Sequence, residues 1–301
     1  MDSVIQVQQL AHTYGKQVIY EDLNFTVSPG KVVGLLGKNG VGKTTLIKIL
    51  MGFLRPSSGY CKVFGEDSHK ISPQTRSRIG LLFEGHLTYD KFMTIEQLEH
   101  FYAPFYPNWN REYYYQLIEL LGLPYTRKVG SMSCGQRSQV VLGLLMAQQA
   151  ELLILDDYSM GLDAGYRRLF LDYMQEYLRN GNKTVFLTSH VIQDMERFVD
   201  EVIFLERGGK LLCTSLQTFI KTFKCFHLPI QSHKKLRKDE HPLAAGCIKN
   251  IETHPDHYQC FSFSSLNLVA AELAAQGFDS SALEQVPMNL EDAFIGYTGR
   301  Y

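Results

Sequence analysis

The sequence of 301 residues has no apolar run long enough for a membrane-spanning helix, which needs about 20 residues. It also has no basic segment followed by an apolar stretch near its first residues, so we expect no signal peptide. A chain of this kind is expected to reach a membrane only through a partner.

Neither sign of charge is in excess, because 30 Lys and Arg stand against 31 Asp and Glu. Proteins that bind nucleic acid commonly carry a basic patch, so a nucleic-acid partner is not expected. The six cysteines are scattered and none forms a CxxC pair, which argues against a zinc site. They are interpreted as reduced, mostly structural thiols of a cytosolic protein.

The patterns that are present predict an α/β domain. Residues 31–36 form an apolar strand that runs into a glycine-rich turn and then a helix near Thr44. Alternating residues and short apolar runs predict further strands, the apolar ones in a parallel sheet covered on both faces. These strands are expected at 4–10, 23–27, 151–155 and 184–188.

A helical subdomain is expected at about 86–150, with a capping box at Thr94 and Gln97 and a second helix start at Ser133. It would belong to a main domain over 1–216. A small α+β appendage is expected over 217–301. Within the appendage we expect a polar, basic linker or exposed loop at 231–243, a strand at 258–263, and helices at 266–276 and 290–297.

A phosphate-binding loop is predicted directly after the strand at 31–36. Glycines let a backbone point its N–H groups at an anion, and a helix N-terminus adds the positive end of its dipole. Lys43 is expected to reach the β- and γ-phosphates of a nucleotide, and the Thr44 hydroxyl to ligate Mg²⁺. A chance match is the alternative, which the flanking strand and helix disfavour. The loop reads Gly37-Lys38-Asn39-Gly40-Val41-Gly42-Lys43-Thr44-Thr45 and fits G-x-x-x-x-G-K-[ST].

Two acids, Asp156 and Asp157, follow the predicted strand at 151–155. In a P-loop enzyme an Asp at this place holds Mg²⁺ opposite the loop threonine, here Thr44. Asp157 would then lie beside the γ-phosphate and polarise the attacking water. Acids are also common where a strand turns into solvent, and only the phosphate loop upstream makes this alternative the weaker one.

Over about residues 4–215 the chain resembles the ATP-binding subunits of ABC (ATP-binding cassette) transporters. The phosphate loop and the acid pair are two of its motifs, and the others follow in the family order. These others are a signature at Met132-Ser133-Cys134-Gly135-Gln136 that is similar to LSGGQ, a D-loop at Gly161-Leu162-Asp163, the switch histidine His190, the adenine-stacking Tyr14 and Glu84 at the Q-loop position.

The resemblance implies an ABC-type P-loop NTPase fold with an N-terminal antiparallel β subdomain, which binds ATP and Mg²⁺ and hydrolyses ATP. The helix start at Ser133, with the N–H groups of Cys134 and Gly135, would bind the ATP of a facing subunit, so a homo- or heterodimer is implied. His190 would hydrogen-bond the γ-phosphate, and Glu84 would offer an oxygen to Mg²⁺. A separate integral-membrane permease is the implied partner, which would hold the chain at the inner face of the cell membrane.

Four positions depart from the family pattern. Asp157 replaces the catalytic Glu and is one methylene shorter, and a misplacement of ~1 Å can cost about a hundredfold in rate. Glu84 replaces Gln, Cys134 replaces Gly, and Tyr158 replaces Pro, the last for no reason visible in the sequence. We predict slowed rather than abolished hydrolysis. A degenerate ATP-binding regulatory subunit, which leaves hydrolysis to another chain, stays open.

The region 86–115 is rich in aromatic residues, and the resemblance places a groove for a permease helix beside it. At least half of these rings are expected to belong to the core. The stretch at 105–109 and the tail at 290–297 are similar to those of peptide and drug exporter ATPases. The alternatives are a non-hydrolytic nucleotide sensor and a soluble ABC ATPase without a membrane partner. Soluble ABC ATPases usually carry two cassettes, a coiled-coil insertion or zinc modules, and this sequence shows none of them.

Overall fold

The structure is a computed structural model, and it describes residues 3–83, 92–159, 162–179, 183–189, 191–230 and 246–299. The chain forms two compact units, Met1–Cys213 and Thr214–Tyr301. Within the described ranges, no helix is both long and apolar enough to cross a bilayer. The cysteines are all free thiols, as the sequence predicted.

A six-stranded sheet of order β10-β9-β3-β8-β7-β6 runs through the centre of the first unit. Its central strands pair in parallel: β3 with β8 and β9, and β7 with β6 and β8. Every residue of β3, β7 and β8 is buried, because both faces of the sheet are covered, and the strands predicted there are confirmed. The strands are β3 (Val32–Leu36), β6 (Ile79–Leu82), β7 (Leu152–Leu155), β8 (Thr184–Leu187), β9 (Glu201–Leu205) and β10 (Leu211–Ser215).

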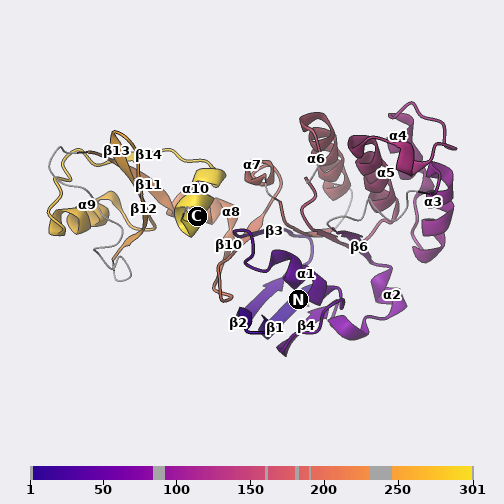
Figure 1. The fold of residues 1–301 in the computed structure, drawn as a ribbon, viewed down its shortest axis with the longest axis horizontal. Helices are drawn as coiled ribbons and strands as arrows, with labels where there is room; N and C mark the ends of the chain where they lie inside the picture. The colour runs from indigo at the N-terminus through magenta and orange to yellow at the C-terminus, as the bar shows by residue number, and fades with distance from the viewer. Residues whose placement is uncertain are drawn as a thin grey trace. The chain divides into compact units, whose positions relative to one another are not determined.

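An antiparallel sheet of order β2-β1-β4-β5 and the helix α1 lie on one side of the central sheet (Figure 1). Apolar side chains from both sheets and from α1 share one core. The strands predicted at 4–10 and 23–27 are correct in type but too short, because β1 and β2 continue to a two-residue turn at Gly15. The elements are β1 (Ile5–Tyr14), β2 (Gln17–Val27), β4 (Ser58–Val63), β5 (Glu66–Asp67) and α1 (Lys43–Leu50).

Longer helices cover the opposite side of the central sheet (Figure 1). They are α3 (Ile95–Tyr102), α4 (Arg111–Glu119), α5 (Cys134–Ala147) and α6 (Ala164–Arg179), and the shorter helices of the unit are α2 (Pro73–Arg76) and α7 (Ile192–Met195). The predicted capping box at Thr94 and Gln97 is confirmed, with N–H to oxygen distances of 3.2 and 2.9 Å. Tyr114 is fully buried in the core of this helical region, and its hydroxyl donates to Ile95 O at 2.7 Å.

The second unit is an α+β domain around an antiparallel sheet of order β12-β13-β11-β14. The predicted strand and two helices are confirmed, but three further strands were missed. The pattern of β11 is obscured because it begins with Lys224 and ends with Pro229, and β14 is too short to show an alternation. The linker predicted at 231–243 lies outside the described residues. The elements are β11 (Lys224–Pro229), β12 (Ile248–Thr253), β13 (His257–Ser262), β14 (Glu284–Val286), α8 (Leu216–Thr222), α9 (Leu266–Ala275) and α10 (Leu290–Thr298).

Candidate active site

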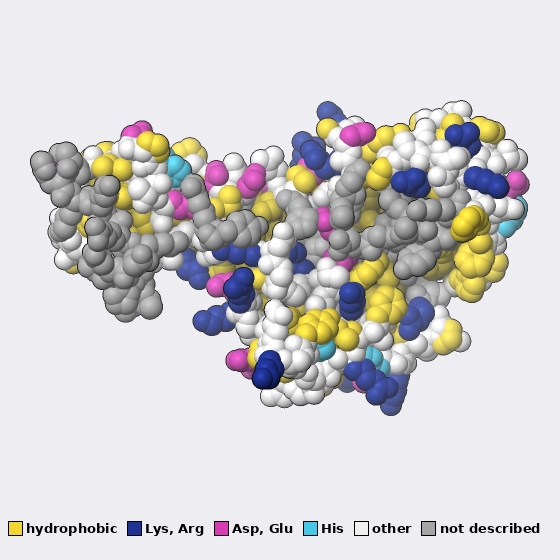
Figure 2. Space-filling view, viewed as in Figure 1, with side chains coloured by type: hydrophobic (Ala, Val, Ile, Leu, Met, Phe, Trp, Pro, Cys, Tyr) yellow, Lys and Arg dark blue, Asp and Glu magenta, His cyan; other side chains and the backbone are white. Residues whose placement is uncertain are grey.

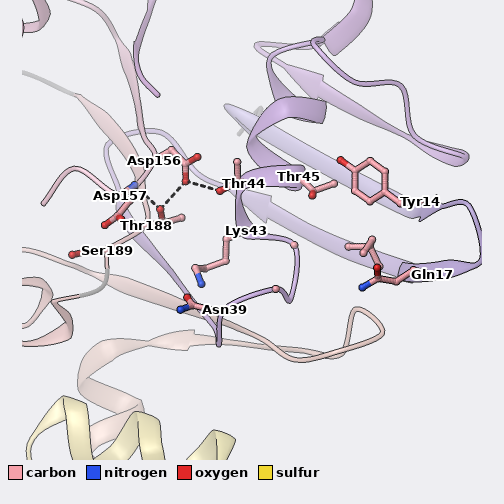
Figure 3. Close-up of a pocket in the computed structure, with 13 residues that line it drawn as sticks. Tyr14, Gln17, Asn39, Lys43, Thr44, Thr45, Asp156, Asp157, Thr188 and Ser189 are labelled. Atoms are coloured by element: carbon pink, nitrogen blue, oxygen red, sulfur yellow. Dashed lines mark hydrogen bonds between the residues drawn. The ribbon is translucent and has the colours of Figure 1, made fainter. Parts of the chain in front are cut away.

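A cavity of about 490 Å³ lies where β3, β7 and β8 end in the first unit (Figure 3). The carboxyl ends of parallel strands meet at one edge of a sheet, so the loops that follow these strands converge there. The loop after β3 contributes the phosphate loop, the loop after β7 the two acids, and the loop after β8 two hydroxyl residues. The lining residues are Tyr14, Gln17, Ile19, Asn39, Gly40, Gly42, Lys43, Thr44, Thr45, Asp156, Asp157, Thr188 and Ser189.

Two glycines of the phosphate loop are required by close packing. Gly42 has a φ of 107°, and a Cβ atom there would collide with the hydroxyl oxygen of Tyr20. That hydroxyl donates a hydrogen bond to the carbonyl oxygen of Gly42. At Gly37 a Cβ atom would lie only 2.6 Å from Leu205 O. The loop is therefore held from β2 on one side and from β9 on the other.

Lys43 reaches back over the phosphate loop. Its Nζ donates to Gly37 O at 2.6 Å and to Lys38 O at 3.1 Å. Burial lowers the pKa of Lys43 from its usual value, while the charges of Asp156 and Asp157 act in the opposite direction. A partly desolvated cation at the loop can exchange its carbonyl partners for phosphate oxygens.

Asp156 is almost fully buried, at 2% exposure, and faces Thr44, the second residue of α1. Its Oδ1 accepts from Thr188 Oγ1 at 3.0 Å and from Thr44 Oγ1 at 3.4 Å (Figure 3). Hydroxyl and carboxylate oxygens are the ligands that Mg²⁺ prefers in proteins. The residues present at this point of the cavity therefore fit a magnesium ion.

Asp157 occupies a left-handed backbone conformation, with a φ of 48°. Among residues other than glycine, Asp and Asn adopt this conformation most readily. Its backbone N–H donates to Thr188 Oγ1 at 2.8 Å, and Ser159 Oγ donates to its Oδ1 at 3.4 Å. Ser159 Oγ also lies 2.9 Å from Ser189 Oγ, so the loops after β7 and β8 are joined by hydroxyl groups.

Tyr158, which has no explanation in the sequence, has one in the structure. Its ring is buried and stacks on Phe170 of α6, with 4.9 Å between ring centroids and an interplanar angle of 14°. Burial raises the pKa of its hydroxyl. The side chain therefore anchors the loop that carries Asp157 to the helix behind it.

At the opposite end of the cavity lie Tyr14, the last residue of β1, and Gln17, the first residue of β2 (Figure 3). The Tyr14 ring is 47% exposed and meets His12 edge to face at 4.7 Å. A half-exposed ring at a cavity mouth offers a face on which a base can stack. The cavity thus has an aromatic ring at one end and the phosphate loop with the acids at the other, which suits a ligand with an aromatic and an anionic part.

The signature residues do not line this cavity. Ser133 is confirmed as the N-cap of α5: its Oγ accepts from the Gln136 N–H at 3.2 Å, and Gln136 Oε1 accepts from the Ser133 N–H at 3.0 Å. Cys134 and Gly135 are the first two residues of the helix. Among the D-loop residues, Leu162 and Asp163 are described. Gly161, His190 and Glu84 lie outside the described residues.

Sequence reasoning missed Thr188, Ser159 and Ser189 as members of the site. Thr188 follows β8 just as Asp156 follows β7, and this equivalent position next to a parallel strand is the signal that could have identified it. Val41 of the phosphate loop is buried in the core rather than in the cavity lining.

Comparison with known proteins places this geometry in a family. Residues 20–159 match the family described as ABC transporter. The bacitracin transport ATP-binding protein BcrA of Bacillus licheniformis is 31% identical over 214 residues, which are 70% of this chain and 69% of that protein. The chain belongs to the ABC transporter family. This chain is also 29% identical to the Nod factor export ATP-binding protein I of Cupriavidus metallidurans over 308 aligned residues. The alignment covers 100% of this chain and 99% of that protein.

Solved structures agree with the ABC fold. An ATP-binding subunit of an ABC transporter superposes with a TM-score of 0.64 at 24% identity, and the match covers 73% of this chain and 92% of that chain. The cbiO1 protein of Clostridium perfringens, part of the cbiONQ complex, gives a TM-score of 0.58 at 21% identity over 71% of this chain and 89% of its own. The predicted ABC-type P-loop NTPase fold is confirmed. As a member of the family, the ABC chain binds ATP and is an ATPase.

Proposed function

We propose that this ABC chain hydrolyses ATP as one of two facing cassettes and thereby powers an exporter through a separate membrane permease. The observation that carries the proposal is the cavity in which Lys43, Thr44, Asp156 and Asp157 converge. A cation, a hydroxyl and two carboxylates around a glycine-rich turn form the set that phosphoryl transfer to water requires.

ATP would lie along the cavity with its phosphates on the loop Gly37–Thr45 and its adenine on Tyr14. Backbone N–H groups and the Lys43 ammonium would bind the β- and γ-phosphates. Asn39, which points into the cavity beside Lys43 in Figure 3, would lie at the end of the cavity that holds the phosphates.

Mg²⁺ would be held by Thr44 and Asp156, together with Glu84, and would neutralise charge on the β- and γ-phosphates. Asp157 would accept a proton from the attacking water, and His190 would hydrogen-bond the γ-phosphate. Thr188 would support this chemistry, since its hydroxyl contacts Asp156 and the Asp157 backbone together.

The second cassette, identical or related, would present its own α5 start to this ATP. Ser133 caps that helix, and the first N–H groups of an α-helix have no partner within the helix. In one chain Ser133, Cys134, Gly135 and Gln136 stay outside the cavity, which supports a role toward the nucleotide of a facing copy. The D-loop at 161–163 would lie along the same interface.

The permease would dock on the helical region and hold the chain at the inner face of the cell membrane. Exposed aromatic side chains support this, since Phe101 and Phe105 are 49% and 63% exposed and meet edge to face, with 5.8 Å between their ring centroids. Figure 2 shows hydrophobic side chains gathered over α3. Relatives named for bacitracin transport and Nod factor export support an exporter.

The test compares wild type with Asp157→Asn in Mg-ATP. Wild type should hydrolyse ATP slowly, whereas Asp157→Asn should bind ATP, fail to hydrolyse it and accumulate as a dimer in analytical ultracentrifugation. Asp172→Asn, an exposed acid on α6, is the matched control and should behave as wild type. A wild type that binds ATP without single-turnover hydrolysis would indicate the regulatory subunit instead. If neither wild type nor Asp157→Asn forms a dimer in the presence of ATP, the pair of facing cassettes is ruled out.

The membrane partner is tested separately. Co-expression with a polytopic membrane protein, sought among the products of the neighbouring genes, should yield a complex in detergent, and a Phe101→Asp, Phe105→Asp double variant should weaken it. Ile220→Asp, at a residue of the second unit that is 42% exposed, is the control. Equal recovery with all three chains would contradict docking at α3.

A further inference from the structure

The space that a side chain at Gly135, the second residue of α5, would occupy is filled by the ring of Tyr166. A Cβ atom on Gly135 would collide with Cδ2 and Cε2 of Tyr166 and would lie 2.9 Å from its Cγ. These are the three nearest atoms apart from the local helix backbone. Because Cγ is bonded directly to the tyrosine Cβ, turning the ring about that bond would not remove the collision.

The backbone of Gly135 does not itself require glycine. Gly135 has no positive φ, in contrast to Gly40 and Gly42 of the phosphate loop. An alanine would therefore fit the local chain geometry. What excludes it within the described structure is the Tyr166 ring.

Tyr166 is fixed from the D-loop. Its backbone N–H donates to Asp163 Oδ1 at 3.0 Å, and the Arg167 N–H donates to Asp163 O at 3.0 Å. Asp163 thus caps the first turn of α6 and orients the residue that covers Gly135. Through Tyr166, the D-loop acid is linked mechanically to the start of the signature helix.

We propose that Tyr166 is a positioning residue, whose ring against Gly135 sets the direction in which the N–H groups of Cys134 and Gly135 meet the ATP of the facing cassette. The inference rests on the proposed function, in which those N–H groups bind that ATP. Tyr166 does not line the cavity of its own chain. It should therefore affect hydrolysis in the closed pair and leave ATP binding by the single chain unchanged.

The kinetic test uses the full chain with Tyr166→Ala, Tyr166→Phe and Tyr173→Ala. Tyr173, also on α6 and partly exposed, provides the matched control. Because misplaced groups lose rate steeply, Tyr166→Ala should lower kcat about tenfold or more, with the dissociation constant for ATP within about twofold of wild type. Tyr166→Phe should keep most of the rate, since the ring rather than the hydroxyl makes the contact. Equal kcat for Tyr166→Ala and Tyr173→Ala would overturn the proposal.

A stability test needs no hydrolysis, so it distinguishes failure of this inference from failure of the proposed function. Alanine is a better helix former than glycine. Gly135→Ala should lower the thermal midpoint in the parent chain, where the ring blocks the new methyl group, and raise it in the Tyr166→Ala background. The double variant should also recover part of the ATP-driven association that Gly135→Ala loses. The same effect of Gly135→Ala in both backgrounds would show that the ring is not the reason for the glycine and would refute the proposal.

Discussion

Thr188 Oγ1 lies 3.0 Å from Asp156 Oδ1, so a hydroxyl after β8 orients the carboxylate after β7. The same oxygen accepts the backbone N–H of Asp157 at 2.8 Å. One side chain therefore holds the residue expected to ligate Mg²⁺ and the residue expected to polarise water. An aliphatic side chain at this position could make neither of the two contacts.

Thr188→Val should lower hydrolysis while nucleotide binding without Mg²⁺ is kept. A buried hydrogen bond to a charged group is worth about 1.5–3 kcal/mol, which corresponds to a fall in kcat of roughly 10- to 100-fold. Steady-state hydrolysis and binding of a fluorescent ATP analogue would measure the two quantities. Thr188→Ser keeps the hydroxyl and should recover most of the rate. Full activity in Thr188→Val would show that Asp156 needs no such support.

Asp157→Glu should hydrolyse ATP faster than wild type and be less stable. The longer side chain restores about a bond length of reach, and misplacement on that scale costs about a hundredfold in rate. Against this, Asp adopts the φ of 48° more readily than Glu does. Holding Glu in this conformation should cost about 1 kcal/mol, which is equivalent to a factor of roughly five in an equilibrium or a rate. The gain should therefore exceed the loss, by roughly twentyfold. Single-turnover rates and thermal midpoints would test both parts, and an unchanged rate would refute the argument from side-chain length.

Lys43→Ala should weaken ATP binding. Loss of a charge-assisted contact to phosphate is worth about 1.5–3 kcal/mol, which is roughly a 10- to 100-fold rise in Kd. Lys48 lies in the same helix but outside the cavity lining, so Lys48→Ala should bind ATP as wild type does. Isothermal titration calorimetry with ATP would compare the three proteins. Unchanged affinity in Lys43→Ala would remove the phosphate loop from the proposed site.

Tyr20 makes stability depend on pH in the alkaline range. Burial raises the pKa of its hydroxyl above the usual 10.0. Since the folded pKa exceeds the unfolded one, this stability contribution is complete below pH 10 and is lost as the pH rises further. Urea unfolding between pH 7 and 11 should show wild type losing more stability above pH 10 than Tyr20→Phe.

At neutral pH wild type should be the more stable protein. Tyr20→Phe should be less stable than wild type by about 1 kcal/mol, because the carbonyl oxygen of Gly42 loses its hydrogen-bond donor. Burial also raises the pKa values of Tyr114, Tyr158 and Tyr177, so the variant should retain part of the alkaline loss. Tyr60→Phe, which removes a hydroxyl from the surface strand β4, is the control. Parallel pH profiles for all three chains would argue against a buried Tyr20 hydroxyl.

The parts of the site that could be predicted from sequence are those with a required local pattern. A glycine-rich turn between a strand and a helix specifies its own geometry, and an apolar strand that ends in Asp156 and Asp157 must place both acids at the sheet edge. The helix starts at Thr94 and Ser133 were predictable for the same reason, since a capping box lies within four residues.

The other parts depend on pairing between distant segments. A serine or threonine after a strand is common, so the position of Thr188 after β8 is only a weak signal, and nothing in the sequence singles out Ser159 until the loops after β7 and β8 are side by side. The same holds for Tyr166, whose significance depends on its contact with Gly135 some thirty positions earlier. In the second unit, short strands such as β14 are specified by their neighbours rather than by their own residues.

The position of β3 between β8 and β9 has a consequence for biosynthesis. The strand that leads into the phosphate loop, Val32–Leu36, is flanked by Thr184–Leu187 and Glu201–Leu205, both made much later. During translation the nascent N-terminal segment must therefore wait, with its apolar strand unpaired, until the ribosome has released residues beyond 205. Nascent chains arrested before that point should not retain ATP, and early exposure of β3 makes this interval the one in which a chaperone is most useful.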